Sequence, residues 1–142
     1  MARGKDAKHA LLRNVGLFSA CSDKELGSIA KLMTEVPVSA GSAIVREGAA
    51  GREFFVIAEG TAKVTAGGRK RATLGPGAFF GEMSLIDHGP RTATVTAETP
   101  MKVYVLDARE FGGLLDASPT VTRKILKTLA ARLRDTEKAH TH

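Results

Sequence analysis

The sequence predicts a mainly β fold with helices at both ends, and three observations lead to it. Between Glu35 and Leu106, seven short runs of β-prone residues are separated by glycines. Before this region, Leu26 and Ile29 recur at helical spacing, and after it apolar residues do the same. The short, regularly spaced runs indicate a closed, antiparallel double sheet. At 142 residues, we expect a single domain, residues 1–142.

The first 34 residues are predicted to form an N-terminal helical segment. Residues 1–10 are basic and polar without apolar periodicity, so we expect a loose arm or a frayed first turn there. Ser22 to Glu25 has the pattern of a capping box, in which the serine and the glutamate each satisfy a backbone N–H of the other. This pattern predicts a helix that runs from there to about Met33.

The predicted barrel, residues 35–106, contains runs rich in valine, isoleucine, threonine and aromatic residues. Glycines fall at the breaks, where the chain needs a tight reversal or a positive φ. The predicted strands are residues 35–38, 43–46, 53–58, 61–66, 70–74, 92–98 and 101–106.

Two helices are predicted in residues 107–138. Asp107 to Glu110 resembles a helix start, and Ser118-Pro119 is an N-cap followed by proline at the first helical position. The second helix has basic residues on its other faces, which we expect to be solvated while the apolar face packs. The apolar stripe consists of Val121, Ile125, Leu126, Leu129 and Leu133.

Composition narrows the function classes. The chain has 21 lysines and arginines against 15 acids, a net charge of +6. This charge favours an anionic ligand or an acidic surface, and equally it keeps a small protein soluble. The single cysteine, Cys21, excludes a disulfide framework or a cysteine-built metal site. With no signal peptide and no membrane-spanning run, a soluble, cytoplasmic protein is expected.

Residues 79–95 have the composition of an anion site. Gly81 allows close backbone approach to a ligand, and Glu82 to Leu85 can wind into one turn whose N–H groups face a negative charge. Pro90 fixes φ and returns the chain to extended structure at Arg91, whose rigid guanidinium suits a phosphate. The Glu82 carboxylate accepts hydrogen bonds, which suits ribose hydroxyls. The segment therefore predicts a site that reads phosphate and sugar together.

The run FGEMSLIDHGPRTATV resembles the phosphate-binding cassette of cyclic nucleotide-binding domains, as in protein kinase regulatory subunits and the catabolite activator family. Two further runs, IVREGAAGREFFVIAEGTAKV and LGPGAFFGE, resemble the jelly-roll strands of that family, a double-stranded β-helix. The resemblance implies that the last helix is a lid over the base and often a dimer contact. It also implies that Glu82 holds the ribose 2′-hydroxyl and Arg91 the exocyclic phosphate oxygen. The implied binding set is Gly81, Glu82, Met83, Ser84, Leu85, Arg91, Thr92 and Ala93, with Thr92 or Thr94 at the base.

These features predict a stand-alone sensor that prefers cyclic AMP, with cyclic GMP possible. Its C-terminal helices are expected to move on binding and to regulate an unknown protein partner. A homodimer through the last helix is a further expectation. Thr92 resembles a position that favours guanine, so both nucleotides stay open. The alternative is a catabolite-activator-like regulator that lacks its own DNA-binding domain and acts through protein contacts, because few residues follow Leu133. No catalytic set is apparent, so we expect neither an enzyme nor direct DNA binding.

Overall fold

The computed structural model describes residues 4–140, with side chains described for residues 8–137. It divides into two compact units. The barrel unit is Leu32–Gly112, and the helical unit joins the described residues before Leu32 with those after Gly112. Each unit is treated by itself below.

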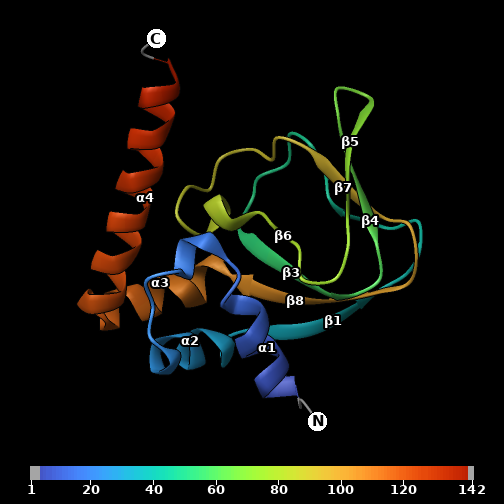
Figure 1. Cartoon of the computed structure of the whole chain (residues 1–142). Coiled ribbons are helices and arrows are strands. Elements are labelled where there is room, and N and C mark those ends of the chain that lie inside the picture. Colours follow the sequence, from blue (N-terminus) through green and yellow to red (C-terminus); the bar gives the residue numbers. More distant parts are fainter. Residues whose placement is uncertain (1–3, 141–142) are drawn as a thin grey trace. The chain divides into compact units, whose positions relative to one another are not determined.

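Among the described residues, eight strands form two four-stranded antiparallel sheets, both in the barrel unit (Figure 1). One sheet has the order β1-β8-β3-β6 and the other β2-β7-β4-β5, so β1, β6, β2 and β5 are edge strands. The chain changes sheet repeatedly, which makes most pairings long-range. The strand bounds are β1 Thr34–Val38, β2 Ala43–Val45, β3 Glu53–Glu59, β4 Ala62–Ala66, β5 Arg69–Leu74, β6 Phe79–Phe80, β7 Thr94–Ala97 and β8 Met101–Asp107.

The predicted fold class is confirmed, and each of the seven predicted strands is present with its ends shifted by two residues or fewer. Only β6 was missed, because two residues cannot show an alternating pattern. Side chains from β3 and β8 of one sheet and β4 and β7 of the other fill the space between the sheets. Its buried side chains are Phe55, Ile57, Ala62, Val95, Ala97, Met101 and Val103.

Residues 1–10 were expected to form a loose arm or a frayed first turn of helix. In the described part both expectations fall short, because residues Gly4–Leu12 form the nine-residue helix α1; residues 1–3 lie outside the described range. Leu12 is fully buried, and the Arg13 guanidinium lies 2.6 Å from the Asp23 carboxylate at the start of the next helix, α2. The basic composition of this segment gave no sign of a helix, because the helix depends on packing and on an ion pair with residues outside the segment.

Helix α2, Asp23–Ala30, follows a short 3₁₀ helix, η1, at Gly16–Phe18. The predicted capping box is confirmed, since Ser22 Oγ accepts from Glu25 N at 3.2 Å and Glu25 Oε1 accepts from Ser22 N at 2.8 Å. The predicted end at Met33 was wrong, because the helix ends at Ala30. Thr34 begins strand β1, and its pairing with Val105 draws the preceding residues out of the helix.

Helices α3, Ala108–Ala117, and α4, Pro119–His140, begin where the caps predicted. Asp107 Oδ1 accepts from Arg109 N at 2.7 Å, and Ser118 Oγ accepts from Val121 N at 3.3 Å.

The apolar stripe predicted for α4 is only partly buried. Val121 and Ile125 are buried, but the predicted packing was wrong for Leu126 and Leu133, which are 60% and 61% exposed. At 3.6 residues per turn these two leucines lie about 100° and 80° around the helix axis from Ile125. The sequence pattern therefore predicted a wider buried face than α4 has.

Candidate functional site

The cassette, residues 79–95, lines a cavity of about 430 Å³ in the barrel unit. Seven of the eight predicted site residues line it. Val95, at the end of the cassette, forms an apolar wall together with Val45 and Val64, which lie outside the cassette. Leu85, the eighth, is buried instead, so only its backbone could take part as the cassette resemblance implied. The seven are Gly81, Glu82, Met83, Ser84, Arg91, Thr92 and Ala93.

The predicted turn is present as a 3₁₀ helix, η2, at Glu82–Leu85. It begins after Gly81, whose φ of +79° is left-handed and favours glycine. A Cβ at Gly81 would also lie 2.6 Å from Arg91 Nη1 and 2.8 Å from the Glu53 carbonyl oxygen. Two independent constraints, conformation and space, thus require glycine at this position.

Arg91 lies within the cavity wall and is half-buried. Its Nη1 donates to Ser84 Oγ at 2.9 Å, and its guanidinium carbon lies 5.7 Å from the centre of the Phe55 ring. Burial lowers the pKa of Arg91, an effect opposed by the nearby Glu53 carboxylate. An arginine stays charged despite such a shift, so the site contains a partly desolvated cation.

A loop before β3 fixes the backbone of Arg91. Gly48 N donates to the Arg91 carbonyl at 2.8 Å, Arg91 N donates to the Ala49 carbonyl at 2.7 Å, and Gly51 N donates to the Gly89 carbonyl at 3.1 Å. Gly51 is buried, and a Cβ there would lie 2.5 Å from Ser84 Oγ and 2.9 Å from Arg91 Nε. Sequence reasoning identified these glycines only as turns, because their partners lie about forty residues away along the chain.

The two threonines proposed for the base have different surroundings. Thr92 is exposed and lines the cavity. Thr94 is not among the residues that line it, and its hydroxyl accepts a hydrogen bond from Glu47 N at 2.9 Å. Thr92 is therefore the better placed of the two for contact with a ligand.

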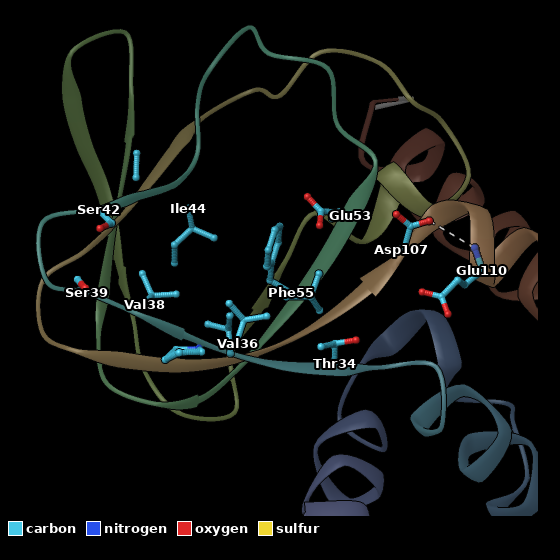
Figure 2. Close-up of a pocket in the computed structure, with 14 residues that line it drawn as sticks. Thr34, Val36, Val38, Ser39, Ser42, Ile44, Glu53, Phe55, Asp107 and Glu110 are labelled. Atoms are coloured by element: carbon cyan, nitrogen blue, oxygen red, sulfur yellow. Dashed lines mark hydrogen bonds between the residues drawn. The ribbon is translucent and has the colours of Figure 1, made fainter.

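A second cavity, of about 580 Å³, lies elsewhere in the barrel unit (Figure 2). Apolar side chains of β1, β2 and β3 point into it, including Val36, Ile44 and Phe55. No residue that lines this cavity also lines the cassette cavity. The barrel unit thus has two separately lined cavities.

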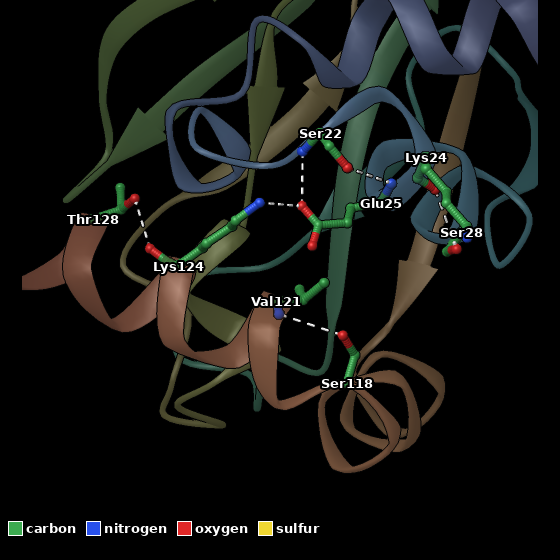
Figure 3. A network of polar contacts seen from close by, with 8 residues as sticks. All are labelled: Ser22, Lys24, Glu25, Ser28, Ser118, Val121, Lys124 and Thr128. Atoms are coloured by element: carbon green, nitrogen blue, oxygen red, sulfur yellow. Dashed lines mark hydrogen bonds and ion pairs between the residues drawn. The ribbon is translucent and has the colours of Figure 1, made fainter.

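In the helical unit, a polar network joins α4 to the start of α2 (Figure 3). Lys124 Nζ lies 2.6 Å from Glu25 Oε1, the oxygen that also accepts from Ser22 N. The hydrogen bond from Lys124 is the main reason why the pKa of Glu25 is lowered. Helix α4 is therefore held to the N-terminal helices by a charge pair as well as by packing.

Two further findings concern what the described part of the chain contains. None of its helices combines the length and apolarity needed to cross a bilayer. Nor does it bring three or more histidine, cysteine, aspartate or glutamate side chains together in an arrangement able to hold a metal ion.

Known proteins share both the sequence and the fold of this chain. The family model "Cyclic nucleotide-binding domain" matches residues 35–118. A cAMP-dependent protein kinase regulatory subunit from Yarrowia lipolytica is 39% identical over 106 residues, covering 73% of this chain and 28% of that protein. A cyclic nucleotide-gated potassium channel from Mesorhizobium japonicum is 36% identical over 122 residues, covering 86% of this chain and 34% of the channel. The chain thus spans about a third of these curated relatives.

A solved structure, the N-terminal domain of a transcriptional regulator from Streptomyces coelicolor A3(2), superposes with a TM-score of 0.82 at 36% identity. The match covers 91% of this chain and 93% of that one. The family match, residues 35–118, includes every residue that lines the cavity around Arg91. The chain belongs to the cyclic nucleotide-binding domain family.

Proposed function

We propose that this domain binds cyclic AMP, in preference to cyclic GMP, as a regulatory ligand, and that it is not an enzyme. The observation that carries the proposal is Arg91, a half-buried cation in the wall of a cavity that Glu82 also lines. A phosphate diester would offset the desolvation of the guanidinium, and the Glu82 carboxylate would accept from a ribose hydroxyl. The apolar wall of Val45, Val64 and Val95 suits a purine.

The remaining cassette residues complete the proposed site. Backbone N–H groups between Gly81 and Leu85, with that of Ala93, would face the phosphate. Ser84 N is already used within the turn, where it donates to the Gly81 carbonyl at 3.0 Å, so its hydroxyl rather than its N–H is the group next to Arg91. Met83, which is 46% exposed and lines the cavity, would be covered when a base binds.

The preference for cyclic AMP is supported by the kinase regulatory subunit, which is named for its dependence on cyclic AMP. Calorimetric titration with cyclic AMP, cyclic GMP and linear 5′-AMP tests the proposal. We expect both cyclic nucleotides to bind, cyclic AMP at least as tightly, and 5′-AMP much more weakly because its phosphate dianion has a different shape. A tenfold preference for cyclic GMP, about 1.4 kcal/mol, would overturn the choice of nucleotide.

We further propose that binding changes the position of the C-terminal helices and so regulates a protein partner in the cytoplasm. The division between the two units falls inside α3, at Gly112 and Gly113. A Cβ at either glycine would meet nothing within 4 Å, so packing does not require glycine there. Two adjacent glycines weaken a helix interior, which suits a point of bending.

Distance measurements test this movement directly. Spin labels on Cys21, in the helical unit, and on a cysteine replacing the exposed Glu98, in the barrel unit, would report on the two units separately. We expect the distance distribution to change when cyclic AMP is added, and to change less in a variant carrying Gly112→Ala and Gly113→Ala. An unchanged distribution in the labelled parent would refute the movement.

A second candidate function follows from the Streptomyces structure, which is the N-terminal domain of a transcriptional regulator and matches almost the full chain. In this version the domain acts on transcription through protein contacts without binding DNA itself. Its partner could be a second copy, since Leu126 and Leu133 expose apolar surface on α4. Sedimentation with and without cyclic AMP tests for a second copy as the partner. A DNA mobility-shift assay tests both versions, because direct DNA binding by this chain would contradict either one.

A further inference from the structure

The larger of the two cavities in the barrel unit is not the cassette cavity. At about 580 Å³ against 430 Å³, it falls within the size range of small-molecule sites. It is lined from β1, β2, β3, β8 and the start of α3, and β1 and β2 are edge strands of different sheets. An opening between two unpaired edges gives a ligand access without breaking a strand pairing.

Part of the wall of this cavity is apolar and belongs to the core, while Thr34, Ser39 and Ser42 add hydroxyl groups. Phe55 and Val103 are buried members of the core between the sheets, at 5% and 1% exposure. Val36, Val38 and Ile44 are half-buried, and Figure 2 shows their side chains facing the same space. A ligand with an apolar body would therefore find preformed walls on several sides.

One end of the cavity is acidic. Glu53, Asp107 and Glu110 lie together at the end near α3 (Figure 2), and no lysine, arginine or histidine lines the cavity. This distribution is unusual in a chain with a net charge of +6. Within the described residues, none of these three carboxylates takes part in an ion pair. Glu53 does lie near the Arg91 guanidinium, whose charge it favours.

The three acids do not form a metal site. Asp107 Oδ1 is occupied as the cap of α3, accepting from Arg109 N at 2.7 Å and Glu110 N at 3.4 Å. Across the described part of the chain, no group of such side chains is arranged to hold a metal ion. The complementary ligand is thus an organic cation, whose larger charged group needs no close coordination.

The stacked rings of Phe55 and Phe80 separate this cavity from the cassette. Their centroids are 4.9 Å apart, with Phe55 lining the larger cavity and Phe80 the cassette cavity. A molecule in the larger cavity would contact one member of the pair without touching the phosphate arginine. The two cavities therefore have separate linings, although the Arg91 guanidinium carbon lies 5.7 Å from the centre of the Phe55 ring.

We propose that the larger cavity is a second ligand site, which binds a small organic monocation with an apolar body, such as an aromatic amine. The ammonium group lies among Glu53, Asp107 and Glu110, and the apolar body lies against Phe55, Val36 and Ile44. This site does not depend on the proposed function, because it shares no lining residue with the cassette.

Two probes of nearly equal shape and opposite charge test the site. Tryptamine and indole-3-propionate both carry an indole on a short chain, one ending in an ammonium and the other in a carboxylate. We expect tryptamine to bind the intact chain at least tenfold more tightly at low salt, measured by ligand-observed NMR titration. Added salt should weaken tryptamine binding, because exposed charges are screened. Equal affinity for the two probes would overturn the proposal.

Single substitutions show which cavity tryptamine occupies. Glu110→Gln removes one charge from an exposed position and should weaken tryptamine binding severalfold, whereas Glu98→Gln, an exposed acid outside the cavity, should not. Ile44→Phe should abolish binding by filling the space, and Glu110→Gln stands in if that variant does not fold. Arg91→Ala removes a cation near Glu53, so it should not weaken tryptamine binding even if it abolishes nucleotide binding. Loss of tryptamine binding in Arg91→Ala, or its displacement by cyclic AMP, would place the probe in the cassette instead.

Discussion

Lys124 in the helical unit and Arg91 in the barrel unit are both half-buried cations, but their surroundings differ. Lys124 lies 2.6 Å from Glu25, so its charge is neutralised within the protein. Arg91 donates to a neutral hydroxyl and lies over an aromatic ring, and in the described part of the chain it forms no ion pair. The first arrangement stabilises a fold, whereas the second leaves a cation able to bind an anion.

This difference indicates how a charge that stabilises the fold can be told from a charge that binds a ligand. Removing a neutralised charge should lower the stability of its own unit, because its partner is left without a counter-charge. Removal of an arginine without an anionic partner should cost affinity for a ligand and little stability. The predictions below test this distinction, beginning with the largest expected effect.

Arg91→Ala should remove about 2–5 kcal/mol of cyclic nucleotide affinity, the range for loss of one partner from a desolvated charge pair. Arg91→Lys should restore only part of it, because an ammonium lacks the guanidinium's two parallel donors. Calorimetry measures both, and thermal unfolding should show little change. Arg71→Ala, at an exposed position outside the cavity, is the matched control. Near wild-type affinity in Arg91→Ala would remove Arg91 from the site.

Gly51→Ala should weaken nucleotide binding by about 1–3 kcal/mol, the penalty expected when a polar partner is misplaced. The new Cβ would collide with Ser84 Oγ and Arg91 Nε, two side-chain atoms that can move, so the protein should still fold. Calorimetry measures the loss of affinity, and circular dichroism shows whether the variant folds. Gly75→Ala is the control, since a Cβ there meets nothing within 4 Å and its φ is not left-handed. Equal affinity for Gly51→Ala and Gly75→Ala would show that Arg91 does not need this glycine.

Thr92→Ala should cost about 1 kcal/mol of cyclic GMP affinity, the size of one net hydrogen bond, while cyclic AMP affinity changes less. This result would mean that the hydroxyl meets the guanine base. A comparable loss for both nucleotides would instead assign Thr92 to the phosphate that they share. Thr73→Ala, an exposed threonine on β5 outside the cavity, serves as control in the same titrations.

Glu25→Gln and Lys124→Gln should each lower the stability of the chain, with a coupling energy of about 0.5–1 kcal/mol in a double-mutant cycle. Glutamine at position 25 can keep the capping box, so that variant mainly removes the charge. Urea unfolding gives the stability of the wild type, the two single variants and the double variant. Lys127→Gln, an exposed lysine on the same helix, is the control. A coupling energy of zero would show that the pair of Lys124 and Glu25 does not stabilise the fold.

The same pair predicts a pH dependence. Glu25 has a lowered pKa in the folded protein, chiefly because Lys124 donates to it, so folding favours the ionised form. Its contribution to stability is therefore complete above the unfolded pKa, about 4.3, and is lost as the pH falls through the lower folded value. Urea midpoints measured from neutral pH downward should converge for the wild type and Glu25→Gln in acid. A difference that persists undiminished in acid would contradict this assignment.

How well the sequence predicted each region depended on the range of the interactions that form it. The caps at Ser22 and Ser118 and the left-handed Gly81 depend on neighbours within a few residues, so local patterns revealed them. The helical state of residues 4–12 depends on packing and on an ion pair with Asp23, which no local pattern shows. The role of Gly51 likewise depends on Arg91, forty residues further along the chain.

The same limit applies to the cavities. The cassette motif predicted seven residues that share a cavity, but not Val45 of β2 and Val64 of β4, which help to complete its wall. The larger cavity had no motif at all, because its lining comes from short pieces of β1, β2, β3 and β8 and the start of α3. A motif can identify the chemistry of a site, but its shape depends on how the strands pair.

The edge strands of the barrel unit have a consequence for self-association. An unpaired edge is a template on which another chain can add a strand, and natural proteins discourage this with short edges, proline or charge. Here β2 and β6 have three and two residues, β1 contains Pro37, and β5 begins with the exposed Arg69, Lys70 and Arg71. Three of the chain's basic residues thus protect a sheet edge from aggregation, a role that requires no acidic partner and no ligand.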